Sequence, residues 1–293
     1  MAPMSDRLLQ LNDRGPDVAE AQSLLNRDGA ILDPDGVFGN DTVQAVRELQ
    51  GVANLPNMPI NGVIDTAVWQ FLRGLPEPSA DIPTRAVAFI GREEVGSRRL
   101  YDSHCARPAW PGGGSGVTIG VGYDLGYQTG LEEDWAGLLS PDQLSALRPW
   151  LGIRGSSAAA GLAQLAHVTV AWRGAWTAFI RRSLPEKIVA TRQAFPGCDR
   201  LPKLCMGVLV SLVYNRGAAL ADPANLPGER QEMRDIRDAV AVGSLKDIPA
   251  ALRSMKRLWP EGSGLRDRRE REALLFEEGL QPVTGDRVNN STM

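Results

Sequence analysis

The sequence predicts an α+β fold that is mostly helical: a small three-helix domain followed by a larger domain with one small β-hairpin or sheet. Apolar residues recur at helical spacing through most of the chain. A turn-then-helix pattern occurs twice within residues 8–75, and one glycine-rich run, residues 117–124, is rich in β-branched residues. At 293 residues, the chain is long enough for one or two domains, each with a buried core.

The first domain is expected over residues 8–75. Its first helix follows Gly15-Pro16-Asp17, with Asp17 as the expected N-cap. A turn at residues 35–42 precedes the second helix, and a related turn at residues 61–66 precedes the third. Repeated units of this kind bury one shared apolar seam.

A linker is expected over residues 76–83, because three prolines in this segment disfavour a helix and make a semi-stiff spacer. Beyond it, Thr84 is expected to cap a helix, and Ser140 is expected to form a capping box with Gln143. Further helices are expected around residues 158–168, 171–182, 186–195, 202–214, 229–241, 246–257 and 264–277. The predicted domains are therefore residues 1–75 and residues 84–293, joined by the linker.

The charge distribution also indicates two modules. Residues 1–80 carry 5 Arg and 11 Asp or Glu, whereas residues 81–293 carry 27 Lys or Arg and 24 Asp or Glu. The net charge of −3 argues against nucleic acid as the main partner. The sequence has no run of 18 uncharged apolar residues, so we expect no membrane insertion. The first residues do not resemble a secretory signal, so we expect synthesis in the cytoplasm without a signal peptide. We also expect the protein to be a monomer.

The residue types available for catalysis are carboxylates rather than metal ligands or nucleophiles. An odd number of cysteines without a Cys-x-x-Cys pair predicts no disulfide framework, and pairing of Cys198 with Cys205 stays open. His104 and Cys105 are adjacent, and adjacent residues seldom reach the same metal, so no metal and no cofactor is expected. The Gly-x-Ser-x-Gly motif of serine hydrolases is absent from the sequence.

Paired carboxylates suit glycoside hydrolysis. Such a reaction needs one carboxyl held protonated and a second carboxylate that orients water or stabilises the sugar cation. A helix that ends near Glu94, followed by a hairpin that ends in Tyr123-Asp124, offers both groups. Gly120 and Gly122 would let a sugar chain approach the backbone, and Tyr123 is a further candidate for substrate binding. On residue types alone, a glutamate at a helix end and an aspartate in a hairpin are more often solvated surface groups.

The same segment resembles the active-site segment of the phage-type lysozymes. The resemblance begins at Glu94 and Tyr101 and continues through residues 115–126, which are similar to the pesticin-like branch of that family. Residues 211–217 resemble the family's buried S-x-x-[FY]-N-x-G helix, and residues 264–276 resemble its C-terminal GL-x-x-RR-x-x-E helix. Together these motifs span most of residues 84–280 in the family's order.

This resemblance implies a lysozyme-like second domain and a role for each matching residue. Glu94 matches the general acid, Thr118 the threonine that holds the attacking water, and Asp124 the second carboxylate. In many phage lysozymes the second carboxylate precedes the threonine, which makes Asp102 the reserve candidate.

The sequence departs from the family at one further point. The glutamate of many phage lysozymes is followed directly by glycine, but here Val95 stands before Gly96. A shift of one residue would turn the side chain by ~100° around the helix, so Glu93 is kept as a further reserve.

The C-terminal motif contains Arg268 and Arg269 near Glu272. We expect these side chains to form a structural ion network, with lining of a glycan groove as the alternative.

The first domain resembles the three-helix peptidoglycan-binding domain of cell-wall hydrolases. The resemblance rests on residues 15–50, including the turn Asp35-Gly36-Val37-Phe38-Gly39. Together the two resemblances imply a modular phage endolysin whose partner is bacterial peptidoglycan in the periplasm or cell wall. Its expected reaction is hydrolysis of the β-1,4 bond between N-acetylmuramic acid and N-acetylglucosamine, which leads to lysis of the host cell. The first domain would then act as a tether that raises the local substrate concentration.

Three alternatives remain open on the sequence. A bacterial muramidase toxin or effector would share the fold and the chemistry. A lytic transglycosylase needs the acid but no carboxylate that orients water. A non-hydrolytic peptidoglycan-binding protein would keep the fold as a scaffold alone.

Overall fold

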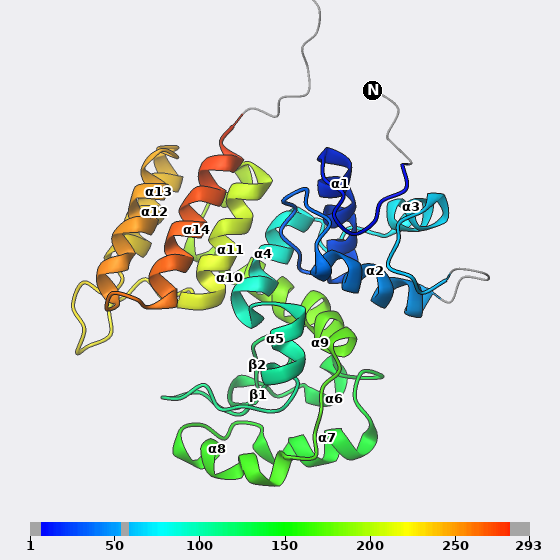
Figure 1. Cartoon of the computed structure of the whole chain (residues 1–293). Coiled ribbons are helices and arrows are strands. Elements are labelled where there is room, and N and C mark those ends of the chain that lie inside the picture. The colour runs from blue at the N-terminus through cyan, green and yellow to red at the C-terminus, as the bar shows by residue number, and fades with distance from the viewer. Residues whose placement is uncertain (1–6, 54–58, 282–293) are drawn as a thin grey trace, which may run out of the picture. The chain divides into compact units, whose positions relative to one another are not determined.

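The computed structural model describes residues 7–53 and 59–281 (Figure 1). The chain divides into two compact units, Met1–Glu186 and Lys187–Met293. This division falls inside the predicted second domain, and the predicted domain limits stay a prediction. Each unit is described by itself below.

The fold is mostly helical with one small sheet, which confirms the predicted class. Within the described residues the sheet consists of β1 (Thr118–Ile119) and β2 (Tyr123–Asp124), which run antiparallel. The predicted hairpin is therefore present. None of the helices described is both long enough and apolar enough to cross a membrane.

The predicted helices are present with shifted ends. The helices of the first unit are α1 (Pro16–Leu25), α2 (Asn40–Ala53), α3 (Thr66–Gly74), α4 (Thr84–Val95), α5 (Arg98–Leu100), α6 (Leu131–Asp134), α7 (Pro141–Leu147), α8 (Ser156–Gly161) and α9 (Trp172–Ala178). They are followed by α10 (Leu184–Ala194), α11 (Lys203–Arg216), α12 (Gln231–Val242), α13 (Asp247–Ser254) and α14 (Gly264–Gly279). The short helices α5 and α6 were not predicted.

Helices α1, α2 and α3 enclose one apolar core, as the repeated turn-then-helix pattern predicts. Its large members are almost fully buried: Leu9, Val18, Leu25, Phe38, Val46, Leu49, Ile64, Val68, Trp69 and Leu72. The Trp69 indole donates a hydrogen bond to the Arg7 carbonyl at 2.9 Å, so its polar edge is also satisfied.

A buried glutamine holds the first of the two related turns. The Gln22 amide nitrogen donates to Asp35 Oδ1 at 2.9 Å and to the Val37 carbonyl at 3.1 Å. Its amide oxygen accepts from the Gly36 N–H at 2.9 Å. Gly36 has φ 72°, a conformation that favours glycine. One side-chain amide therefore serves both a donor and an acceptor of the turn, while the backbone of residues 12–15 pairs with that of residues 36–38.

The second turn is held in the same way by Gln50. Its amide nitrogen donates to Asn61 Oδ1 and to the Val63 carbonyl, both at 3.0 Å. Its amide oxygen accepts from the Gly62 N–H at 2.9 Å. The internal repeat seen in the sequence is thus a repeat of hydrogen bonding as well as of helix order.

Two predicted helix caps differ from the structure. Asp17 lies inside α1, whose N-cap is Gly15, and its carboxylate accepts from the Val18 N–H and from Arg7. The hydrogen bond from Arg7 lowers the pKa of Asp17. At this position the carboxylate still complements the positive end of the helix, but it does not cap it.

Thr84 is the first residue of α4, and Pro83 occupies the N-cap position. The Thr84 hydroxyl donates to Glu77 in the preceding segment instead of accepting from the helix. The predicted capping box is confirmed at α7, where the Ser140 hydroxyl accepts from the Gln143 N–H at 3.2 Å.

In the second unit, Asp222 organises the segment between α11 and α12. Its carboxylate accepts from the Arg230 N–H at 2.6 Å, from the Gly228 N–H at 3.0 Å and from the Arg234 side chain at 3.2 Å. These hydrogen bonds, led by that from the Arg230 backbone, lower the pKa of Asp222 to about 2. The ionised carboxylate is therefore the form that the folded segment requires.

The Gln22→Ala substitution should lower the free energy of unfolding by about 2–4 kcal/mol. It leaves the half-buried Gly36 N–H without its acceptor, and it removes the donor to Asp35, to the Val37 carbonyl and to the buried Thr42 hydroxyl. Urea unfolding followed by tryptophan fluorescence measures the change. The control is Gln70→Ala on the exposed face of α3, which should stay within about 0.5 kcal/mol of the parent. Equal losses in both variants would contradict the role given to Gln22.

The Asp222→Asn substitution should destabilise the protein at neutral pH and progressively less in acid. Because the pKa of Asp222 is lower folded than the ordinary value of about 3.9, its contribution is present above about pH 4 and is lost as the pH falls toward 2. Thermal unfolding of both proteins across this range measures the difference in midpoint, which should shrink with acidity. Asp238→Asn, at an exposed position of α12, is the matched control.

Candidate functional site

Glu94 lies at the C-terminal end of α4, directly after Glu93, and both side chains are half-buried. The helix ends at Val95, which is buried, and the Gly96 N–H donates to the Arg92 carbonyl at 2.7 Å. Gly96 has φ 77° and turns the chain away from the helix. The extra residue before the glycine thus keeps Glu94 within the helix.

Thr118 and Asp124 are brought together by the hairpin, because they are opposite each other in the register of β1 and β2. Asp124 Oδ1 accepts from the Gly116 N–H at 2.9 Å and from the Gly126 N–H at 2.8 Å. A Cβ at Gly116 would lie 2.5 Å from Asp124 Oδ1, so glycine is required there. Asp124 Oδ2 makes no hydrogen bond to the rest of the described chain.

The Thr118 hydroxyl is buried and has no hydrogen-bond partner within residues 7–53 and 59–281. Leaving a buried hydroxyl without a partner costs about 1–3 kcal/mol. Such a group commonly marks a place for an ordered water or a ligand atom. This matches the water-holding role that the family resemblance implies for Thr118, although the role itself stays a prediction.

Tyr123 anchors β2. Its ring is 2% exposed, its hydroxyl donates to Asp134 Oδ2 at 2.6 Å, and Asp134 Oδ1 pairs with Arg182 at 3.2 Å. Burial, together with the bond to Asp134, raises the pKa of Tyr123. The ring also meets Trp135 edge-on, with 5.5 Å between centroids. The structure gives Tyr123 a supporting role in the hairpin, and the predicted substrate contact stays a prediction.

The two glycines predicted to face a sugar chain differ in exposure. Gly122 is exposed, whereas Gly120 is buried, and a Cβ there would lie 2.9 Å from Trp135. Both glycines have a positive φ, which is 59° at Gly120 and 70° at Gly122. Gly120 is thus required by packing against Trp135, which leaves Gly122 as the exposed one of the pair.

Asp102, the reserve carboxylate, lies in a π-helical turn, Tyr101–Cys105. It is exposed and accepts a hydrogen bond from Arg98 at 3.1 Å. The preceding Tyr101 is buried and donates to the Val170 carbonyl at 2.8 Å.

The described residues contain no group of three or more His, Cys, Asp or Glu side chains arranged to hold a metal ion. Cys105, Cys198 and Cys205 are free thiols, so Cys198 and Cys205 are not paired. Burial raises the pKa of Cys205 to about 12 and that of Cys198 less strongly. Neither buried thiol is activated as a nucleophile.

In the second unit, Arg268, Arg269 and Glu272 form a buried ion network, which confirms the predicted structural role. Glu272 lies 3.2 Å from Arg268 and 2.9 Å from Arg269, and the Ser211 hydroxyl donates to Glu272 at 2.7 Å. Arg269 also donates to Asn215 at 3.2 Å. The two later motifs of the resemblance, on α11 and α14, are therefore joined by their polar residues. Removing one member of such a buried network is strongly destabilising.

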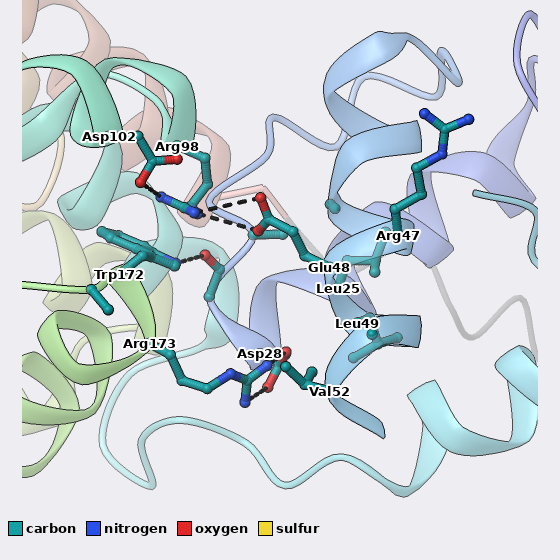
Figure 2. A pocket seen from close by; sticks show the side chains of 15 residues that line it. Leu25, Asp28, Arg47, Glu48, Leu49, Val52, Arg98, Asp102, Trp172 and Arg173 are labelled. Atoms are coloured by element: carbon teal, nitrogen blue, oxygen red, sulfur yellow. Dashed lines mark hydrogen bonds and ion pairs between the residues drawn. The ribbon is translucent and has the colours of Figure 1, made fainter. Parts of the chain in front are cut away.

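A pocket of about 440 Å³ in the first unit was not predicted from the sequence (Figure 2). Residues of α1 and α2 line one side, and residues of α5 and α9 line the other. Two ion pairs cross the hollow, Asp28 with Arg173 and Glu48 with Arg98. Burial raises the pKa of Asp28, and Arg173 opposes that shift. The opposite charge excess of residues 1–80 and 81–293 was the sequence signal for these pairs.

Residues 14–72 match the family model described as a putative peptidoglycan binding domain. The match supports peptidoglycan as the partner of this segment and the cell wall as its place of action. It covers the three helices α1–α3 and both glutamine-held turns, in agreement with the resemblance found in the sequence.

Among solved structures, the crystal structure of a Burkholderia AP3 phage endolysin is similar to this chain at 17% identity. The comparison covers 93% of this chain and 100% of the other, with a TM-score of 0.22. A likeness of that size carries no argument about fold or function. No curated protein matches the chain.

The Tyr123→Phe substitution should lower the free energy of unfolding by about 1–3 kcal/mol, because Asp134 then loses one of its two partners in a buried place. Tyr127→Phe is the matched control, since Tyr127 is exposed and its hydroxyl makes only a 3.3 Å contact with the Gly114 carbonyl. Chemical unfolding of both variants measures the difference. A loss as large in the control would contradict the anchoring role of Tyr123.

Proposed function

We propose that this chain is a peptidoglycan hydrolase of the muramidase type, which acts as a phage endolysin. Residues 14–72 bind the wall, and residues 84–293 hydrolyse the β-1,4 bond between N-acetylmuramic acid and N-acetylglucosamine. The observation that carries the proposal is the match of residues 14–72 to a putative peptidoglycan binding domain. The lysozyme-like motifs and the arrangement of the hairpin support its enzymatic half.

In this proposal Glu94 is the general acid. It protonates the glycosidic oxygen as the bond to the muramic acid carbon breaks. Its half-buried position at the end of a helix with an apolar face supports the assignment. Glu93, one position earlier, points about 100° away around the helix and is the natural contrast.

Thr118 and Asp124 act on the water that replaces the leaving group. The unpartnered Thr118 hydroxyl supports a role in holding that water. Asp124 is fixed through Oδ1 by two backbone N–H groups, which leaves Oδ2 to accept a hydrogen bond from the same water. We place Asp124 before Asp102 because the Asp102 carboxylate is exposed and paired with Arg98.

The substrate lies along the exposed edge of the hairpin in this proposal, where Gly122 permits a close approach to the backbone. Tyr123 and Gly120 contribute by keeping the hairpin in place. No metal ion or cofactor enters any of these steps.

The Glu94→Gln substitution should reduce cleavage of Gram-negative peptidoglycan sacculi by about 10²–10⁴-fold, because the acid is lost while the shape is kept. Glu93→Gln should retain activity within about threefold of the parent. Mass spectrometry of the released fragments measures both the rate and the type of chain end.

Chain ends distinguish the remaining alternatives. Reducing muramic acid ends from the parent protein, and none from Glu94→Gln, are the expected result. Anhydro ends would make the protein a lytic transglycosylase. Binding to sacculi without cleavage by the parent would leave a non-hydrolytic binding protein. If Glu93→Gln lost more cleavage activity than Glu94→Gln, Glu93 would be the general acid instead of Glu94.

A further inference from the structure

Residues 7–75 are packed closely against the rest of the first unit. The Trp172 indole donates a buried hydrogen bond of 2.9 Å to the Gly29 carbonyl (Figure 2). Gly29 has φ 88°, and a Cβ there would lie 2.7 Å from Trp176. On the other side of the contact, a Cβ at Gly91 of α4 would lie 3.0 Å from Ile31. The contact therefore has no room for an added side chain at either glycine.

Three acid–arginine pairs surround this packed centre, each with its acid in residues 7–75. They are Asp28–Arg173 at 2.8 Å, Asp33–Arg92 at 3.6 Å and Glu48–Arg98 at 3.4 Å. Their arginines come from α4, α5 and α9. All three pairs have the same polarity, so they act together to fix one orientation.

Arg98 has partners on both sides of the contact. Its guanidinium contacts both Glu48 oxygens and lies 3.1 Å from Asp102, and it stacks 4.9 Å above the Trp172 ring (Figure 2). Its side chain is only 17% exposed. Because Arg98 follows Glu94 by four residues, Glu48 holds the backbone that leaves the helix of the proposed acid.

The segment expected to be a linker is also packed. Ile82 is 1% exposed, and Glu77 accepts hydrogen bonds from Arg27 and from Thr84. A chain segment held at both ends does not behave as a free tether. Residues 7–75 are thus fixed in place by the segment that joins them as well as by the contact face.

We propose that Glu48 is a positioning residue for the reaction: through Arg98 it fixes the segment from Glu94 to Asp102. Residues 7–75 then support the active site in addition to binding the wall. This inference rests on the proposed function for its catalytic part, while its structural part can be measured on its own.

The structural part is tested by hydrogen–deuterium exchange on the full-length protein. Glu48→Gln should raise exchange of backbone amides in residues 96–105 about tenfold at low salt. In the parent protein, about 0.5 M NaCl should raise it in the same direction, because salt screens partly exposed pairs. Glu132→Gln, which breaks the exposed Arg148–Glu132 pair of the same unit, is the control and should leave these amides unchanged.

A charge swap guards against a trivial loss of folding. Asp28→Arg alone should raise exchange in residues 26–32, because it places two arginines together. The double variant Asp28→Arg with Arg173→Asp should restore exchange to within about twofold of the parent. Failure of the swap to restore it would show that the pairs do not hold this contact, and the inference would fall.

The catalytic part is tested with soluble glycan strands freed of their stem peptides and with intact sacculi. Positioning predicts that Glu48→Gln lowers kcat on the soluble strands about tenfold with KM nearly unchanged. A tether predicts a loss on sacculi or in KM alone, and that result would overturn the inference. If the parent cleaves neither substrate, the proposed function fails, and the exchange data alone decide whether Glu48 holds the segment.

Discussion

The hydrogen bond from the Trp172 indole to the Gly29 carbonyl joins parts of the first unit that lie 143 residues apart, and much of the unit depends on it. The same indole ring meets Tyr101 edge-on at 4.9 Å and lies 5.6 Å from Trp176. It therefore sets the position of the turn that carries Asp102 together with that of residues 7–75. Loss of this acceptor would leave a buried N–H without a hydrogen bond, at a cost of about 1–3 kcal/mol.

Much of the fold could be predicted because its signals are local. The Ser140–Gln143 capping box and the hairpin of β1 and β2 involve residues only a few positions apart. The caps at Asp17 and Thr84 were wrong for a physical reason. Gly15, two residues before Asp17, and Pro83, directly before Thr84, occupy the N-cap positions. Both polar side chains find partners earlier in the chain. The sequence shows which side chains are able to cap a helix, but the residue at which the helix begins determines whether such a side chain stands at the N-cap.

In the candidate site, too, the local contacts could be predicted and the long-range ones could not. Thr118 and Asp124 were predicted together because a short glycine-rich hairpin brings them into register. The hydrogen bond from Tyr123 to Asp134 could not be predicted, since nothing in the pattern ties the hairpin to the end of α6. The Glu48–Arg98 and Asp28–Arg173 pairs bridge 50 and 145 positions, and only the charge difference between the two segments hinted at them. Sequence patterns thus point to the candidate residues of the hairpin more readily than to the side chains that hold the hairpin in place.

The contact between Gly29 and Trp172 has a consequence for the order in which the protein is made. Residues 7–75 can close their own core as soon as they leave the ribosome, but the Gly29 carbonyl then stays hydrated until Trp172 has been synthesised. Docking of α9 is a contact of long sequence separation, so it forms late and slowly compared with the helices. During that interval Gly29 and the acidic residues around it, Asp28, Asp33 and Glu48, are exposed on the nascent chain. Asp28 in particular has no basic partner until Arg173, the residue after Trp172, has been synthesised.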